Sequence, residues 1–305
     1  MMNRESLSVL TYLLPIATAV SLLGCGGQDR EAAEQTAAGA ERLAAAGQPA
    51  AGAPNAVRVL AKDFGFDGPS EVPAGLTTFT LVNQGLHPHH LMLIRLDEGK
   101  TMADFAASMQ AGGQPPTWLR MMGGPNAVGP GDQSNATLDL EPGHYAFICV
   151  IPDEHGVPHA AQGMVLPFEV TGTPRSVPAP KADVIMTLVD YGFQTSTPIT
   201  AGTHTIQVDN KGPQPHEVVI ARLEDGKTLA DLMAWFQSGE TPEALPTTPP
   251  PAHFMGGIAP MEAGQTEYFT ADFQSGDYVL LCFVPDAKDG KPHSEHGMVQ
   301  EFKVS

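Results

Sequence analysis

From residue 56 onward, apolar positions come in short runs that are typical of β-strands. The runs are rich in β-branched and aromatic residues, and glycine, proline, asparagine or aspartate bounds each one. In the first half of the chain they are TTFTLVN (77–83), HLMLIRL (90–96), ATLDL (136–140), HYAFICV (144–150) and MVLPFEV (164–170). Their even spacing predicts an all-β chain built as a β-sandwich.

One helical pattern interrupts each half of the chain. In the second half, Thr228 is a candidate N-cap with Asp231 three residues later, and the apolar residues that follow at helical spacing are Leu229, Leu232, Met233 and Phe236. A weaker version of the pattern begins at Thr101, and its residues are Met102, Asp104, Phe105 and Met109. We expect these residues to be core contacts of a short inserted helix.

The chain contains an internal repeat. The motif DFGF at 63–66 recurs as DYGF at 190–193, an offset of 127 residues, which has grown to 134 where Met164 matches Met298. Such self-similarity predicts two homologous domains. We expect them at 56–171 and 183–305, joined by a proline-rich linker at 172–182.

The first 24 residues are expected to be a signal peptide. The apolar run at 7–23 follows Arg4, is short for a membrane span and contains Pro15. LLGC, ending at Cys25, resembles the lipobox of bacterial lipoproteins. The resemblance implies that Cys25 is lipidated and that the chain is anchored in the cell envelope, at the periplasmic face of the outer membrane. A plain secretory signal and a weak membrane anchor are the alternatives.

Composition narrows the class of protein further. Residues 25–55 are mostly alanine, glycine, glutamine and glutamate, which predicts a flexible tether. The formal net charge of −18 argues against a nucleic-acid-binding surface and favours a basic partner. Beside Cys25 there are only Cys149 and Cys282, for which a disulfide is one alternative.

The repeat selects among the eleven histidines of the chain. Only His89 with His216 and His159 with His293 are retained in both copies. His87, His90 and His155 face Gln214, Glu217 and Lys288, and His296 faces Gln162. Each copy therefore keeps His, Cys, His and Met in one order, and these residues are His89, Cys149, His159 and Met164 in the first copy and His216, Cys282, His293 and Met298 in the second.

These residue types predict a soft metal site. Magnesium and calcium prefer oxygen ligands, whereas two imidazoles, one thiolate and a weak thioether match the trigonal copper sites of electron-transfer proteins. Soft sulfur favours Cu(I) and imidazole tolerates Cu(II). A bound cation also accounts for the deprotonation of the thiol.

At this point the chain resembles the cupredoxins, the blue-copper family. NQGLHPH (83–89) and NKGPQPH (210–216) resemble the family segment that carries the first histidine ligand, and PGHYAFIC (142–149) resembles the strand that runs into the cysteine ligand. GMV, at 163–165 and again at 297–299, resembles the segment with the axial methionine. The resemblance implies two tandem Greek-key β-sandwiches, each with a short inserted helix, and up to two type 1 copper ions held by the eight residues named above.

One feature departs from the small members of the family. Nine residues separate Cys149 from His159, and ten separate Cys282 from His293. This spacing is closer to that of the type 1 site in copper nitrite reductases. If each cysteine serves its own domain, the disulfide between them is disfavoured.

Three functions remain as hypotheses. The favoured one is an envelope-anchored, copper-binding electron carrier whose redox partner is not identified. The second is an enzyme such as a multicopper oxidase or nitrite reductase, but apolar residues flank both cysteines and no histidine stands there to relay electrons. The third is a copper-free interaction module made of two β-sandwiches.

Overall fold

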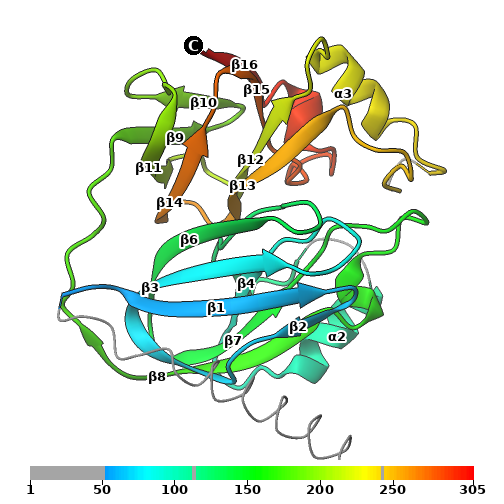
Figure 1. The fold of residues 1–305 in the computed structure, drawn as a ribbon. Coiled ribbons are helices and arrows are strands. Elements are labelled where there is room, and N and C mark those ends of the chain that lie inside the picture. Colours follow the sequence, from blue (N-terminus) through cyan, green and yellow to red (C-terminus); the bar gives the residue numbers. More distant parts are fainter. Residues whose placement is uncertain (1–51, 112–114, 242–243) are drawn as a thin grey trace, which may run out of the picture. The chain divides into compact units, whose positions relative to one another are not determined.

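The computed structural model describes residues 52–111, 115–241 and 244–305 (Figure 1). The expected signal peptide, Cys25 and most of the expected tether lie outside these residues. Within the described part of the chain, no helix combines the length and the apolar character that crossing a membrane requires.

The first half of the chain folds into two layers of strands that share β3. One layer pairs β3 with β1 in parallel and with β6 antiparallel, and the other runs from β3 through β8, β7 and β4 to β5. Apolar side chains between the layers, among them Phe79 and Phe147, form the core. The strands are β1 (Asn55–Lys62), β2 (Gly65–Asp67), β3 (Glu71–Asn83), β4 (Met92–Leu96), β5 (Leu119–Met121), β6 (Gln133–Leu140), β7 (Gly143–Ile148) and β8 (Val165–Arg175).

The second half repeats this arrangement with two four-stranded layers, β10-β9-β11-β14 and β13-β12-β15-β16. Phe273 and Tyr278 are among the fully buried side chains between them. The strands are β9 (Val184–Val189), β10 (Gly192–Thr195), β11 (Gly202–Asn210), β12 (His216–Leu223), β13 (Ala252–Met261), β14 (Thr266–Phe273), β15 (Gly276–Leu281) and β16 (Val299–Val304). The prediction of an all-β chain with cupredoxin-like sandwiches is confirmed.

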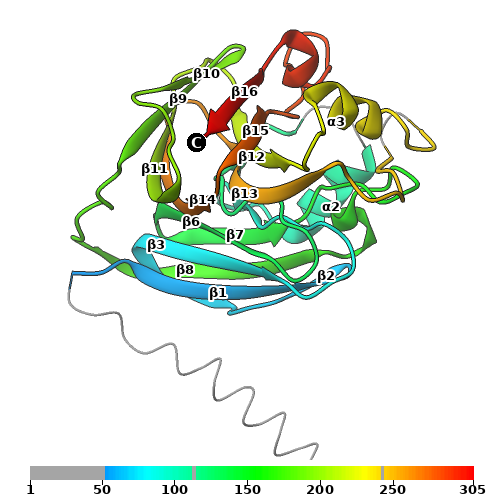
Figure 2. The ribbon, with the colours of Figure 1, turned by 45° about the horizontal axis from the view of Figure 1, so that its top comes forward.

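Both expected inserted helices are present, α2 (Met102–Ala111) and α3 (Leu229–Phe236). The Thr228 hydroxyl accepts from the Asp231 backbone N–H, and the Asp231 carboxylate accepts from the Thr228 backbone N–H. The apolar face of α3 packs on the outer face of β12, β13 and β15. Figure 2 shows α3 beside β12 and β13, with β9 and β11 on the other side of those strands. The helices thus cover a sheet face and leave the space between the layers to the core.

The expected linker begins later than residue 172, because β8 continues to Arg175 and pairs there with Gly75 of β3. The boundaries of the two domains stay a prediction. The described residues 52–305 belong to a single contact unit, and strands of both halves join one sheet through the pair Tyr268 and Thr137 of β14 and β6.

A segment at 122–128, called here the junction segment, hydrogen-bonds to both halves. On one side Val128 pairs with His89, and Leu91 N–H donates to Pro125 O at 2.9 Å. On the other side, isolated bridges connect the segment to Met255, Ile258 and Met261 of β13. The junction segment therefore acts as an irregular strand shared by the two sandwiches.

Glu267 of β14 is buried against the junction segment. Its Oε2 accepts from Gly124 N–H at 3.0 Å, while its Oε1 has no hydrogen-bond partner. A Cβ atom on Gly123 would lie 1.7 Å from that Oε1, so only glycine allows this close approach. Burial raises the pKa of the Glu267 carboxyl well above its usual value.

Replacing Glu267 by glutamine should stabilise the chain increasingly as pH rises. Because the folded-state pKa is raised, the wild-type chain loses stability as pH rises from the unfolded-state value towards the folded-state value, whereas glutamine does not titrate. The free energy of unfolding of E267Q relative to wild type should grow by about 1.4 kcal/mol per pH unit in that window. Urea unfolding from pH 4.5 to 8 measures it, and a pH-independent difference would contradict the assignment.

Candidate metal centre

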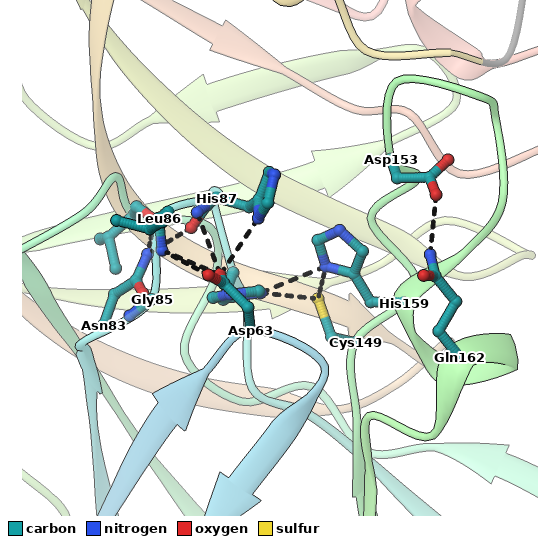
Figure 3. Close-up of polar contacts among 11 residues, drawn as sticks. Asp63, Asn83, Gly85, Leu86, His87, Cys149, Asp153, His159 and Gln162 are labelled. Carbon is teal, nitrogen blue, oxygen red and sulfur yellow. Dashed lines mark hydrogen bonds and ion pairs between the residues drawn. The ribbon is translucent and has the colours of Figure 1, made fainter.

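The structure brings His89, Cys149 and His159 together in the first half, as the repeat predicted. Figure 3 shows Cys149 beside His159. His89 lies just before β4, Cys149 directly follows β7, and His159 opens a short 3-10 helix, His159–Gln162. The two Nδ1 atoms lie 3.2 Å apart, and Cys149 Sγ lies 3.9 Å from His89 Nδ1 and 3.5 Å from His159 Nδ1. All three side chains are buried.

The second half repeats the constellation with His216, Cys282 and His293, which are also buried. The Nδ1 atoms of the two histidines lie 3.0 Å apart, and Cys282 Sγ lies 3.4 Å from His293 Nδ1. Cys149 and Cys282 are both free, so the alternative of a disulfide between them is wrong.

The donor atoms fit a small thiophilic metal ion. A point equidistant from the three donor atoms of the first site lies about 2.1 Å from each, against metal–imidazole and metal–thiolate bonds of about 2.0–2.1 and 2.3 Å. No carboxylate belongs to either three-donor group. The set therefore suits copper or zinc better than calcium or magnesium.

An aspartate positions the first histidine of each site. His89 Nε2 lies 3.2 Å from Asp63 Oδ1, and His216 Nε2 lies 2.7 Å from Asp190 Oδ1. The carboxylate accepts a hydrogen bond from Nε2–H and so leaves Nδ1 as a lone-pair donor aimed at the cysteine, which is the common arrangement around metal-bound histidine. Asp63 also accepts from the backbone N–H groups of Leu86 and His87, drawn in Figure 3.

The loop that carries the first histidine is shaped by an asparagine and a glycine. Asn83 Nδ2 donates to the carbonyls of His87 and Val128, and its Oδ1 accepts from Gly85 N–H. A Cβ atom on Gly85 would lie 2.5 Å from Asp63 Oδ1 and 2.7 Å from His89 Nε2. Asn210 and Gly212 make the same contacts in the second copy. The motif NxGxxPH thus lets a carboxylate approach the ring closely.

The long spacing between cysteine and second histidine is accommodated by a loop that closes on itself. Pro152 pairs with Pro158, so the intervening residues project as a side loop. The backbone of His159 then donates to Ile151 O at 3.0 Å, and Ala160 N–H donates to Cys149 O at 2.7 Å. In the second copy Pro285 pairs with Pro292, and His293 N–H donates to Val284 O. The extra length therefore leaves the second histidine beside its cysteine.

The two methionines lie next to the sites along the backbone. Met164 N–H donates to His159 O at 3.0 Å, and Met164 O accepts from Cys149 N–H at 3.2 Å. Met298 makes the same two bonds with His293 and Cys282. Both side chains are fully buried, and their role as axial ligands stays a prediction.

The donor groups are held in uncharged forms. Burial, followed by the neighbouring histidine, lowers the pKa values of His159 and His293 to about 4. Burial raises the pKa of the Cys149 thiol to about 12 and that of Cys282 above its usual range. Two neutral imidazoles are therefore ready ligands at neutral pH, whereas a thiolate requires a nearby cation.

An aromatic ring covers the second histidine of each site. Phe64 packs edge-on against His159, and Tyr191 packs edge-on against His293, both with centroids 5.2 Å apart. The Nε2 atoms of both histidines are buried without a hydrogen-bond partner. The imidazole rings of His159 and His293 therefore direct Nδ1 towards the cysteine, and an aromatic side chain packs against each imidazole.

Sequence reasoning missed the two positioning aspartates. Asp63 and Asp190 open the DFGF and DYGF motifs, which mark the repeat but contain no recognised ligand. Their retention at the offset of the first histidine was the available signal. Of the histidines that the repeat set aside, His87 contacts Asp63 at the rim of the site, whereas His155 is exposed and pairs with Glu240.

Comparison with known proteins gives likenesses among solved structures only, since no family model and no curated protein matches. A dithionite-reduced auracyanin from Roseiflexus castenholzii is 21% identical over 40% of this chain and 100% of its own, with a TM-score of 0.27. A blue copper oxidase from Nitrosomonas europaea is 14% identical over 82% and 85%, with a TM-score of 0.23. Because these TM-scores are low, function is inferred from the geometry of the site itself.

Removing either positioning aspartate should weaken metal binding at its own site. Without the carboxylate the first histidine can turn or change tautomer, so D63A and D190A should each lower affinity about 10- to 100-fold at one site and spare the other. Competition with a chelator measures this. D67A is the matched control, because Asp67 lies on the same hairpin as Asp63, is half-buried and forms an ion pair with Lys62 away from the site. Equal losses in D67A would contradict the positioning role.

Metal binding should release about one proton per site near pH 7. The histidines are already neutral there and the thiols are protonated, so only the cysteine proton is displaced. Affinity should then rise about tenfold per pH unit between pH 6 and 8. Calorimetry in buffers of different ionisation enthalpy counts the protons, and pH-independent affinity would exclude binding through the thiolate.

Proposed function

We propose that this protein is a copper-binding electron carrier of the bacterial cell envelope, with one His₂Cys(Met) centre in each sandwich. The observation that carries the proposal is the twofold convergence of two imidazole Nδ1 atoms on a buried thiol. Met164 and Met298 are the proposed axial ligands. Copper bound there would cycle between Cu(I) and Cu(II), and the rigid surroundings would keep the donor atoms in place in both states.

Neutral, buried donors favour this reading over a copper-free interaction module. Each site places a thiol and two imidazoles out of water, with the two Nδ1 atoms 3.2 Å apart in the first site and 3.0 Å apart in the second. Buried polar groups without partners are costly. A structural core would be expected to fill these positions with apolar side chains, whereas a metal centre requires this donor set.

The neighbours of the cysteines favour a carrier over an enzyme. Cys149 is flanked by Ile148 and Val150, and Cys282 by Leu281 and Phe283, so neither cysteine has an adjacent imidazole to pass electrons to a further metal. Within the described residues, each three-donor group containing a cysteine lies within one half. We therefore propose one-electron exchange with a partner protein, and the net charge of −18 favours a basic one.

The location follows from the N-terminal sequence alone. We propose that Cys25, in the LLGC motif, carries the lipid anchor. The acyl chains of a lipidated N-terminus give stable membrane attachment when more than one is present. The residues after Cys25 would then separate the sandwiches from the membrane surface.

Adding Cu(II) to the chain that begins at Cys25 should give an intense visible thiolate-to-copper absorption and up to two copper ions per chain. C149S and C282S should each remove one centre with its share of the absorption, and the double variant should remain colourless. H155A is the matched control, because His155 is an exposed loop histidine near the first site and not a ligand.

A wild-type chain that remains colourless, with metal content equal to that of the double cysteine variant, would overturn the proposal. Turnover of oxygen or nitrite by the copper-loaded chain would instead replace the carrier with an enzyme.

A further inference from the structure

The residue after the first histidine ligand has the same structural task in both halves. His90 follows His89, and Glu217 follows His216 at the repeat offset. His90 Nε2 accepts from the backbone N–H of Val150 at 2.9 Å, and Glu217 Oε1 accepts from the backbone N–H of Phe283 at 2.8 Å. Each N–H belongs to the residue that directly follows the site cysteine. Two different side chains thus make one equivalent contact.

Asn126 of the junction segment lies between these two side chains. Its Nδ2 donates to Glu217 Oε2 at 2.9 Å. On the other side, the bond from Leu91 N–H to Pro125 O and the pairing of His89 with Val128 hold the junction segment against the residues on either side of His90. The Nδ2 group further donates to the carbonyls of Val218 and Ile258. Asn126 therefore connects polar groups that belong to different sandwiches.

Burial makes these hydrogen bonds costly to lose. His90 is 3% exposed, Asn126 1% and Glu217 5%. Buried hydrogen-bonding groups keep their partners because losing one leaves a desolvated polar atom. The backbone holds the asparagine as well, since Asn126 N–H donates to Gly257 O at 3.1 Å and the adjacent Pro125 O accepts from Leu91 N–H.

A continuous polar connection therefore runs between the two sites. It begins at Cys149 and passes from the Val150 N–H to His90, then through the backbone bonds of the neighbouring residues to the junction segment. From Asn126 it continues to Glu217 and ends at the Phe283 N–H beside Cys282. His90 and Glu217 are also bonded covalently to the first histidines. Hydrogen bonds in a buried chain polarise one another, because little water is present to screen them.

We propose that His90, Asn126 and Glu217 form a bridge that couples the two metal centres electrostatically and electronically, an inference that rests on the proposed function for its metals. A change of charge at one centre alters the hydrogen bonding beside the other cysteine, and by linkage the effect is reciprocal. With metal ions held at both centres, the bridge would let an electron given up at one be taken up at the other, so that one is oxidised and the other reduced with no proton or further reactant consumed.

The bridge is tested first without metal, by amide NMR of the chain that begins at Cys25. The probes are the N–H groups of Val150 and Phe283. E217Q places an amide group opposite the Asn126 amide, so it should shift the Val150 resonance and speed its hydrogen exchange at least threefold, although Val150 belongs to the other half. In an N126A background E217Q should no longer affect Val150.

N135A is the matched control. Asn135 also connects the halves, because its Nδ2 donates to Thr270 O and its Oδ1 accepts from Thr270 N–H. It is only partly buried, and these hydrogen bonds reach neither site. N135A should leave both amide probes unchanged. A response of Phe283 alone to E217Q, or an equal response of Val150 to N135A, would overturn the bridge. The response of Val150 to E217Q tests the bridge by itself, even if the N126A variant fails to fold.

A second arm uses copper. In C282S, which retains only the first centre, E217Q should shift the reduction potential of the centre at Cys149, whereas N135A should not. A wild-type chain that binds no copper would refute the proposed function while the amide experiment still decides the bridge. Copper binding at both sites without any response of Val150 to E217Q would refute the bridge and leave the proposed function intact.

Discussion

Each candidate metal centre depends on one hydrogen bond, between an aspartate and the Nε2 atom of the first histidine. With Asp63 accepting at Nε2, His89 presents Nδ1 to the thiol, and without it the ring could present either nitrogen or turn away. Burial works against a charged Asp63, but hydrogen bonds from Leu86, His87 and His89 hold its pKa at about 2. The carboxylate is therefore ionised at neutral pH and serves as a fixed acceptor.

The rest of each site is arranged around that bond. Gly85 and Gly212 have no side chain because a Cβ atom would meet both members of the pair. Asn83 and Asn210 hold the loops that deliver the first histidine, with bonds that also reach Val128 and Met261. Since Val128 belongs to the junction segment, the loop at the first centre is fastened to the same segment that contacts β13.

The sequence predicted which histidines converge on each cysteine, because residue type and order survive in the repeat. Alternation and turn residues likewise predicted the strands, and the capping pair Thr228 and Asp231 predicted α3. Other features depend on contacts between distant residues, which local patterns do not encode. Asp63 lies 26 positions before His89, and the excess loop length is removed by a pairing of prolines at its two ends. The junction segment contacts both halves, but it is an irregular strand, so no periodic pattern of apolar residues predicted its position.

The two copies also differ at one buried position beside the sites, and comparison of identical residues alone does not reveal it. Selecting only identical histidines removed His90, because Glu217 stands opposite it. Yet both side chains accept a hydrogen bond from the backbone N–H of the residue that follows the cysteine, so the contact was retained while the residue type changed. An imidazole and a carboxyl group differ in charge and polarity, and they stand beside otherwise equivalent thiols. The two sites are therefore alike in their donor atoms and different in their surroundings, and the proposed exchange of electrons between them would take its direction from such a difference.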